Sequence, residues 1–250
     1  MKPKSTSWNK VAPWYQELLS KADSYQNTVI LPNLLRLLGP IKNKTILDLA
    51  CGQGFFSQAL LNEGAHMVGA DAAPDLIALA KKNIPNGTFH TSSADHLPFI
   101  KDGSCDAVII ILAIQNIKPV DGVFTEVKRV LKPGGRLLLV LNHPAFRIPK
   151  QSSWGWDAET TTQYRRLDRY MSEMTNEIDM HPGQKNSVST VSFHRPLQYY
   201  FKLLTKHNLL VSRLEEWISP KNTAAGPRAA AENLARKEFP LFLFLEATKS

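Results

Sequence analysis

Five short apolar segments alternate with amphipathic segments between residues 45 and 141, and this alternation constrains the fold more than any other feature. The apolar segments are TILDLA, AHMVGAD, GTFHTSSAD with its loop, DAVIIILA and RLLLVL. Pro74 and Gly64 stand where intervening helices would begin and end. The continuous apolar run at 106–113 is typical of a strand buried on both faces. The sequence therefore predicts right-handed βαβ units and an open, doubly wound parallel sheet.

The pattern changes on both sides of this region. The N-terminal part has apolar residues at helical spacing, whereas the stretch after the fifth strand is polar and aromatic with no clean period. Such a stretch suits an insertion over the binding face better than a core element. Regular patterns resume with STVSF, PLQYYFKLLTKHN, LLVSRLEEW and LFLFLEAT. We predict one domain of 250 residues, with a helical cap (1–40), a core (41–142), a lid insertion (143–187) and a C-terminal part of the sheet (188–250).

The chain is basic, but its charge is spread evenly. It carries 30 Lys and Arg against 22 Asp and Glu, a net charge of +8. Residues 1–140 and residues 141–250 each contain 15 basic and 11 acidic side chains. A basic chain can bind RNA or anionic lipid, but the absence of a basic tail favours ordinary solubility charge.

Membrane and secretion signals are missing from the sequence. No apolar run approaches the roughly 18 residues of a membrane span, and the N-terminal segment lacks the apolar core of a secretion signal. Cys51 and Cys105 fit neither a metal-ligand spacing nor a disulfide framework. We therefore expect a cytoplasmic protein without a membrane partner or a bound metal. The oligomeric state is left open.

A glycine-rich turn, DLACGQGFF, follows the first apolar segment, at the strand end where open α/β sheets bind ligands. Gly52 and Gly54 allow positive φ and a close approach of the backbone to a ligand. A P-loop would need Lys and Ser or Thr after the glycines, and none follows. A dinucleotide turn would need a third glycine where Ser57 stands, and Asp48 would repel a phosphate. The turn therefore favours a ligand without phosphate groups.

Acidic residues stand at three successive strand ends. Asp71 lies 19 residues after Gly52, where a carboxylate can accept both hydroxyls of a ribose. Asp95, in SADHLPF, can accept a hydrogen bond from an adenine amine. Together with Asp48 they suit an adenosine that carries an amino acid. A ribose contact alone does not separate NAD from other adenosine cofactors, and a helix cap at Asp71 or a solvated loop acid at Asp95 are the structural alternatives.

Five motifs occur in a fixed order: ILDLACGQG, VGADAAPDLIALAKK, SSADHLPF, DAVIIILAIQNI and EVKRVLKPGGRLLLV. In this order they resemble the class I S-adenosylmethionine-dependent methyltransferases, of the small-molecule type-11 branch, over roughly residues 41–142. The resemblance implies a Rossmann-like, doubly wound, mostly parallel seven-stranded sheet whose last strand is antiparallel, with a helical N-terminal cap and an inserted lid. The family often has glycine where this chain has Ala50, which implies a slightly tighter turn.

The resemblance also implies S-adenosyl-L-methionine as the cofactor. Asp48 and the backbone of the turn would hold the methionine part, Asp71 the ribose and Asp95 the adenine amine. Leu112 and Ile117 would flank the sulfonium. The predicted cofactor-binding residues are Asp48, Ala50, Cys51, Gly52, Gln53, Gly54, Asp71, Ala72, Ala94, Asp95, His96, Leu112, Ile117 and, from the N-terminal cap, Tyr15.

Methyl transfer is an in-line displacement in which the protein supplies alignment and desolvation, and a base is needed only if the acceptor loses a proton. His143, in NHPAFRIP after the fifth strand, is the candidate base, because its ordinary pKa lies near neutrality. His194 is a weaker candidate. The structural alternatives are a loop cap at His143 and a cap or packing group at His194.

The acceptor should lie against the insertion. Arg147 could bind an anionic group, and aromatic side chains beside arginines suit a planar or anionic small molecule. The predicted acceptor residues are Arg147, Trp154, Tyr164 and Tyr170. An ordinary ion pair at Arg147 and a small satellite core under a lid are the alternatives.

The sequence therefore predicts methyl transfer from S-adenosylmethionine to a small-molecule acceptor. An RNA acceptor is the alternative favoured by the net charge and the arginines of the insertion. A non-catalytic cofactor-binding protein is the alternative from another class, and an NAD-dependent oxidoreductase is disfavoured by Ser57. The motifs identify neither the acceptor nor the methylated atom.

Overall fold

The computed structural model describes residue 8, residues 21–179 and residues 189–250. Tyr15 and much of the first half of the predicted N-terminal cap (1–40) lie outside the described residues. Within them, a π-helical turn, η2 (Gln26–Ile30), leads directly into α2 (Leu31–Leu38). The described end of the cap is therefore helical.

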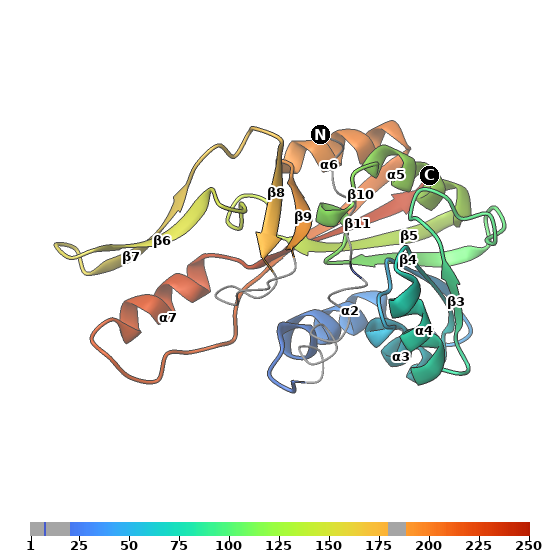
Figure 1. Ribbon diagram of the computed structural model, residues 1–250, viewed down its shortest axis with the longest axis horizontal. Helices are drawn as coiled ribbons and strands as arrows, with labels where there is room; N and C mark the ends of the chain where they lie inside the picture. The colour runs from blue at the N-terminus through green and yellow to red at the C-terminus, as the bar shows by residue number, and fades with distance from the viewer. Residues whose placement is uncertain (1–7, 9–20, 180–188) are drawn as a thin grey trace.

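A seven-stranded sheet forms the centre of the molecule, in the order β10-β11-β5-β4-β1-β2-β3 (Figure 1). Its strands are β1 (Thr45–Leu49), β2 (His66–Asp71), β3 (Thr88–Thr91), β4 (Cys105–Ile111), β5 (Leu131–Asn142), β10 (Leu209–Trp217) and β11 (Phe242–Lys249). The final strand, β11, runs antiparallel to both of its neighbours, whereas the other pairs are parallel. The predicted Rossmann-like sheet is confirmed. The strand order reverses between β1 and β4, which is the switch point where such sheets bind ligands.

Helices cover both faces of the sheet because the central strands are apolar on both faces. In β4, Val108 and Ile110 pack on one side, and Ile109 and Ile111 pack on the other. The first side is covered by α5 (Val120–Val130) and α6 (Leu197–Lys206), and the second by α2 and α3 (Phe55–Asn62). The remaining helices are α4 (Pro74–Asn83), which packs on β2 and β3, the short 3₁₀ helix η3 (Ile114–Asn116) and α7 (Ala229–Glu238).

The insertion contains regular structure that its sequence pattern did not predict. It forms the hairpin β6 (Ser152–Asp157) with β7 (Thr162–Leu167), and the strand β8 (Met174–Asp179), which pairs with β9 (Ser189–His194). Figure 1 shows β6, β7 and α7 projecting from one side of the sheet.

The strand predicted at STVSF exists as β9, but it lies in a two-stranded sheet with β8 and not in the central sheet. The physical reason is its composition. The buried side chains of β9 are Thr190, Ser192 and His194, which would leave polar groups in an apolar core. Among the described helices, none is long and apolar enough to cross a membrane.

Candidate functional site

A cavity of about 1040 Å³ lies at the carboxyl ends of the parallel strands, beside the switch point between β1 and β4. Residues of β8 and β9 form part of its wall. Its volume is sufficient for a nucleoside ligand together with part of a second molecule. The predicted residues on its wall are Asp48, Ala50, Cys51, Gly52, Asp71, Ala72, Ala94, Asp95, Leu112, Ile117 and Arg147.

Several predicted residues do not lie on that wall: Gln53, Gly54, His96, His143, His194, Trp154, Tyr164 and Tyr170. Gln53 and Gly54 belong to the glycine-rich turn, and the N–H of Gly54 donates to the carbonyl oxygen of Cys51 at 3.0 Å. Arg165, one of the arginines that the sequence pointed to in the insertion, lies on the wall as well. The cavity also has residues that the sequence did not indicate: Trp8, Gln26, Gln115, Thr190 and Ser192. Gln26 and Gln115 lie in the short helical turns η2 and η3, and Thr190 and Ser192 lie in β9, where no sequence pattern marked their side chains.

The glycine-rich turn bends sharply at the end of β1. Ala50, Gly52 and Gly54 have φ values of 61°, 56° and 85°, all in the left-handed region. Alanine enters this region at a cost of roughly 1–2 kcal/mol, which glycine would not incur at this position. At Gly54 a side chain is also excluded by space, because a Cβ would lie 2.5 Å from Cδ1 of Ile84.

Asp71, at the end of β2, holds the turn in place. The backbone N–H of Gly52 donates to its Oδ2 at 2.9 Å, and the N–H of Ala73 donates to its Oδ1 at 2.8 Å. Burial raises the pKa of the Asp71 carboxyl, and these two hydrogen bonds oppose the rise. Each carboxylate oxygen retains lone-pair capacity toward the cavity. The structural contacts therefore leave room for the predicted ribose contact.

Asp48 lies beneath the turn and is only 2% exposed. The hydroxyl of Ser57 donates to its Oδ2 at 2.7 Å. Burial raises the pKa of Asp48 to about 7, and the charge of Asp71 adds to the rise. Ser57, at the position of a dinucleotide site's third glycine, thus supports the carboxyl group that faces the cavity.

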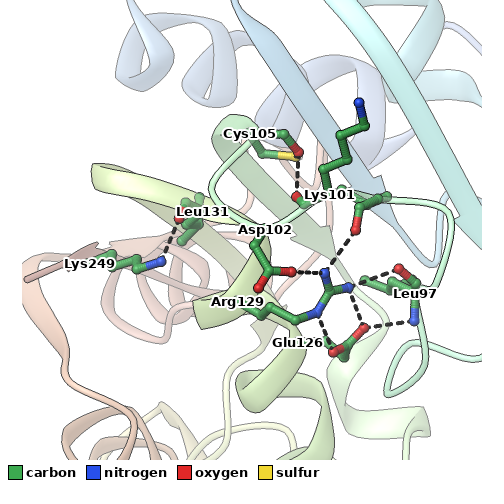
Figure 2. Close-up of polar contacts among 10 residues, drawn as sticks. Leu97, Lys101, Asp102, Cys105, Glu126, Arg129, Leu131 and Lys249 are labelled. Carbon is green, nitrogen blue, oxygen red and sulfur yellow. Dashed lines mark hydrogen bonds and ion pairs between the residues drawn. The ribbon is translucent and has the colours of Figure 1, made fainter.

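Asp95 lies in the loop between β3 and β4, and no described residue donates a hydrogen bond to its carboxylate. A polar network on α5 fixes this loop (Figure 2). The Arg129 guanidinium donates to Glu126 at 2.8 Å, to Asp102 at 2.6 Å, and to the carbonyl oxygens of Leu97 and Ile100 at 2.8 Å.

Glu126 completes this network, because it also accepts the backbone N–H of Leu97 at 2.7 Å. The Arg129 guanidinium lowers the pKa of Glu126 despite its partial burial. The loop that carries Asp95 is therefore anchored to α5 by charge-assisted hydrogen bonds. These two residues were not predicted, although their i, i+3 spacing in EVKRVL indicates a pair on one helix face.

The hydrogen bonds of Gln115 indicate whether the cavity fits a ligand with an ammonium group. It is 9% exposed, and its Nε2 donates to the carbonyl of Leu112 at 2.6 Å. Its Oε1 is buried and has no hydrogen-bond partner within the described residues. A buried acceptor on a cavity wall requires a donor from a ligand or from water. Together with the three carboxylates it suits a ligand that carries positive charge and hydroxyl groups.

His143 has both ring nitrogens engaged outside the cavity. Its Nδ1 accepts the backbone N–H groups of Ala145 and Phe146 at 3.2 and 3.4 Å, so its Nε2–H donates to Glu216 at 2.7 Å. Burial lowers the pKa of His143. The ring closes the turn after β5, which is the loop-capping alternative, and this geometry does not favour a role as the base.

His194 and Tyr170 join the insertion to α6. The Nε2 of His194 contacts the carbonyl oxygen of Tyr170 at 2.8 Å, and the Tyr170 hydroxyl accepts the backbone N–H of Leu197 at 3.1 Å. Burial lowers the pKa of His194. Both side chains therefore hold the insertion against α6 through hydrogen bonds, and neither lines the cavity.

The aromatic residues of β6 and β7 make separate surface contacts outside the cavity wall. The Trp154 ring packs edge-on against Phe239 at 5.4 Å and lies beneath the Arg165 guanidinium at 5.0 Å. The Tyr164 ring covers Gly155, where a Cβ would lie only 2.2 Å from it. Trp154 and Tyr164 are 43% and 47% exposed. Within the described residues, no group of three or more His, Cys, Asp or Glu could hold a metal ion.

Comparison with known proteins gives a consistent result. Residues 47–139 match the family model of a methyltransferase domain. A demethylmenaquinone methyltransferase of Beutenbergia cavernae is 37% identical over 126 residues, which cover 50% of this chain and 52% of that protein. An uncharacterized methyltransferase of Synechocystis sp. is 33% identical over 146 residues, which cover 55% of this chain and 66% of that protein. The chain thus spans about half to two thirds of the length of these curated relatives.

The fold has relatives over most of its length. The crystal structure of an S-adenosylmethionine-dependent methyltransferase from Mesorhizobium loti superposes with a TM-score of 0.70 at 24% identity. The superposition covers 92% of this chain and 99% of that chain. At this identity the likeness establishes the fold, including the C-terminal strands that the family model does not reach.

Proposed function

We propose that this chain transfers a methyl group to a small-molecule acceptor. Its residues 47–139 match the methyltransferase domain family, and its sheet is that of the class I S-adenosylmethionine-dependent methyltransferases. One observation carries the proposal. Asp48, Asp71 and Asp95, from the ends of three adjacent strands, face one cavity beside a glycine-rich turn. This is the arrangement that a cationic amino-acid nucleoside requires.

S-adenosylmethionine is the cofactor that the domain family and this wall support, and when bound it supplies a methyl group on a sulfonium. We assign Asp48, Gln115 and the turn to its amino-acid end, Asp71 to the ribose and Asp95 to the adenine amine. Ala72, Ala94, Leu112 and Ile117 supply apolar wall around it. Gln53, Gly54 and His96 are assigned a supporting role, and the predicted contact of Tyr15 stays a prediction.

The chain's own contribution is alignment and exclusion of water. Residues of β8 and β9 line the cavity, so an acceptor would lie between these strands and the part of the wall assigned to the cofactor, which we call the cofactor half. The described part of the wall contains no histidine. The proposed reaction therefore relies on an acceptor that is already nucleophilic, or on a wall carboxylate such as Glu177, and not on His143.

A small acceptor agrees with the size of the cavity and with the Beutenbergia relative, whose name gives demethylmenaquinone as its acceptor. The domain boundaries, and a cytoplasmic setting, stay part of the same proposal.

Isothermal titration with S-adenosylhomocysteine tests the proposal. We expect the wild type to bind it and Asp71→Asn to bind about tenfold more weakly or worse, because a charge-assisted hydrogen bond contributes about 1.5–3 kcal/mol. The matched control is Asp75→Asn, which changes an exposed aspartate of α4 that does not line the cavity. Failure of the wild type to bind at millimolar ligand would refute the proposal.

A second measurement separates an enzyme from a non-catalytic binding protein. Purified protein is incubated with labelled S-adenosylmethionine and a small-molecule extract, and release of S-adenosylhomocysteine is followed. We expect release that depends on the extract and that Asp71→Asn abolishes. Binding without release from any extract would favour the non-catalytic alternative.

A further inference from the structure

The part of the cavity wall formed by the insertion carries positive charge. Arg147, from the loop after β5, and Arg165, from β7, both line it, and Lys150 lies nearby on the same wall. The cofactor half carries Asp48 and Asp71. The cavity is therefore polarised, with acidic side chains on the sheet and basic side chains on the insertion.

Among the described residues, neither arginine has a carboxylate partner. Six other described arginines are paired with a carboxylate: Arg36, Arg129, Arg136, Arg166, Arg213 and Arg236. Arg169, Arg195 and Arg228 also lack such a pair within the described residues, but they do not line the cavity. Glu177 lies on the same wall, but no ion pair joins it to Arg147 or Arg165 within the described residues. The positive charge at this wall is therefore not neutralised by the described part of the protein.

Neutral groups hold both guanidinium groups in place. Arg165 donates from Nε to the carbonyl of Phe146 at 2.9 Å and from Nη2 to the hydroxyl of Ser152 at 2.8 Å, and it lies over the Trp154 ring. Arg147 donates from Nη1 to Oδ1 of Asn142 at 2.6 Å. A guanidinium has five N–H donors. Arg165 uses two and Arg147 uses one, so both keep donors for a ligand.

The two charges also act on each other. Burial lowers the pKa of Arg147, the nearby Tyr25 side chain opposes this fall, and the neighbouring positive charge of Arg165 adds a smaller lowering. Like charges placed together without a counterion are unfavourable, and an anion bound between them would remove the repulsion. Positioned arginines with unused donors are the protein's usual means of binding carboxylate and phosphate groups.

We propose that the methyl acceptor carries an anionic group, a carboxylate or a phosphate, that Arg147 and Arg165 bind. This inference rests on the proposed methyltransferase function and names the acceptor class for the same site. The anionic group would anchor the acceptor on the insertion and leave its other end toward the cofactor half. The exposed Trp154 ring would then act through Arg165, as a positioning residue.

Titration with three probes of similar shape tests this inference: benzoate, phenyl phosphate and the neutral benzamide. Each is added to the protein with and without saturating S-adenosylhomocysteine, at low salt. We expect both anions to bind about tenfold more tightly than benzamide, since the charge-assisted contacts are absent in the amide. The tighter of the two anions identifies the headgroup. Equal binding of anions and amide, or no anion binding at millimolar probe, would overturn the inference.

Variants then locate the anion. Arg147→Gln and Arg165→Gln should each weaken anion binding about tenfold and leave the affinity for S-adenosylhomocysteine within about twofold. The control is Arg166→Gln, because Arg166 is adjacent on β7, has a 67% exposed side chain, pairs with Asp168 and does not line the cavity. Unchanged anion affinity in both Arg147→Gln and Arg165→Gln would count against the assignment.

Two further measurements keep the result interpretable. Arg165→Gln could loosen the contacts with Phe146 and Ser152, so thermal melting is measured and Arg165→Lys is included, which should recover part of the affinity by charge alone. Failure of S-adenosylhomocysteine to bind the wild type would refute the proposed function, whereas the anion titrations without it would still report on the arginines.

Discussion

Ionisation of the buried Asp48 carboxyl is linked to folding. Its pKa is about 7 in the folded protein, against an ordinary value of 3.8. The folded state therefore keeps a proton that the unfolded chain releases above about pH 4. Below that pH both states are protonated and the full free energy of unfolding is present. As pH rises toward 7 this free energy falls, and above 7 Asp48 causes no further loss.

Asp48→Asn should remove this pH dependence. The variant should be more stable than the wild type near pH 8, by on the order of 2–4 kcal/mol, because each pKa unit corresponds to about 1.4 kcal/mol. The difference should shrink toward about pH 4. Urea unfolding across this pH range measures it, with Asp75→Asn as the control that keeps the wild-type profile. A stability difference that stays constant with pH would contradict the assignment of the titration to Asp48.

The segment NHPAFRIP shows what the sequence could not decide at this scale. His143 and Arg147 lie four positions apart, and both were predicted at the site. Only Arg147 reaches the cavity wall, whereas His143 turns back to cap the chain. In an irregular turn no periodicity dictates side-chain direction, which depends on hydrogen bonds such as that to Glu216 on β10. Asp48, Asp71 and Asp95 line one cavity because strand ends have a defined position in the sheet, and their contacts with a cofactor stay a prediction.

At the scale of elements, α5 controls the loop that carries Asp95. Arg129 links Glu126 on the helix to Asp102 and to two carbonyl groups of the loop (Figure 2). The side chains of Arg129 and Glu126 are 28% and 15% exposed, so solvent screens the pair only in part. The network therefore has a larger effect on stability than a surface ion pair.

Arg129→Ala should lower the free energy of unfolding by about 3 kcal/mol, because it leaves a partly buried carboxylate and two carbonyl groups without their donor. Affinity for S-adenosylhomocysteine should also fall as the Asp95 loop loosens. Denaturant unfolding and titration measure the two effects. The control is Arg213→Ala, an exposed partner of Glu215, for which a change below about 0.5 kcal/mol is expected. Equal losses in both variants would show that the network has no special role.

Elements of the core were predicted well, and those of the insertion were not. The core strands are apolar on both faces, and such a run of apolar residues predicts a buried strand without knowledge of its tertiary contacts. In β6 and β7 the strands are stabilised by pairs that sequence periodicity does not show, such as the Tyr164 ring on Gly155 and the Arg228 guanidinium 4.6 Å from the Trp156 ring. Tyr164 and Gly155 lie on opposite strands of the hairpin, and Arg228 lies far from Trp156 along the chain.

At the scale of the whole molecule, the distribution of charge separates the two acceptor classes. A protein that binds RNA through its backbone needs a continuous basic surface, and the strength of non-specific binding falls with salt according to the number of phosphates contacted. Here the net charge of +8 is divided evenly along the chain, and many described arginines are paired with carboxylates. Arg147 and Arg165, unpaired within the described residues, line a single cavity and not a continuous surface, which suits one anionic group better than a nucleic-acid backbone.

We therefore expect weak, salt-sensitive RNA binding. Fluorescence anisotropy with labelled tRNA should give a dissociation constant of about micromolar or weaker that rises steeply between about 50 and 200 mM salt. Saturating S-adenosylhomocysteine and Arg147→Gln should leave this constant unchanged, because the cavity does not take part. Tight binding that persists at the higher salt, together with methyl transfer to tRNA, would favour the RNA acceptor, since such affinity requires base or shape contacts beyond the diffuse charge of this chain.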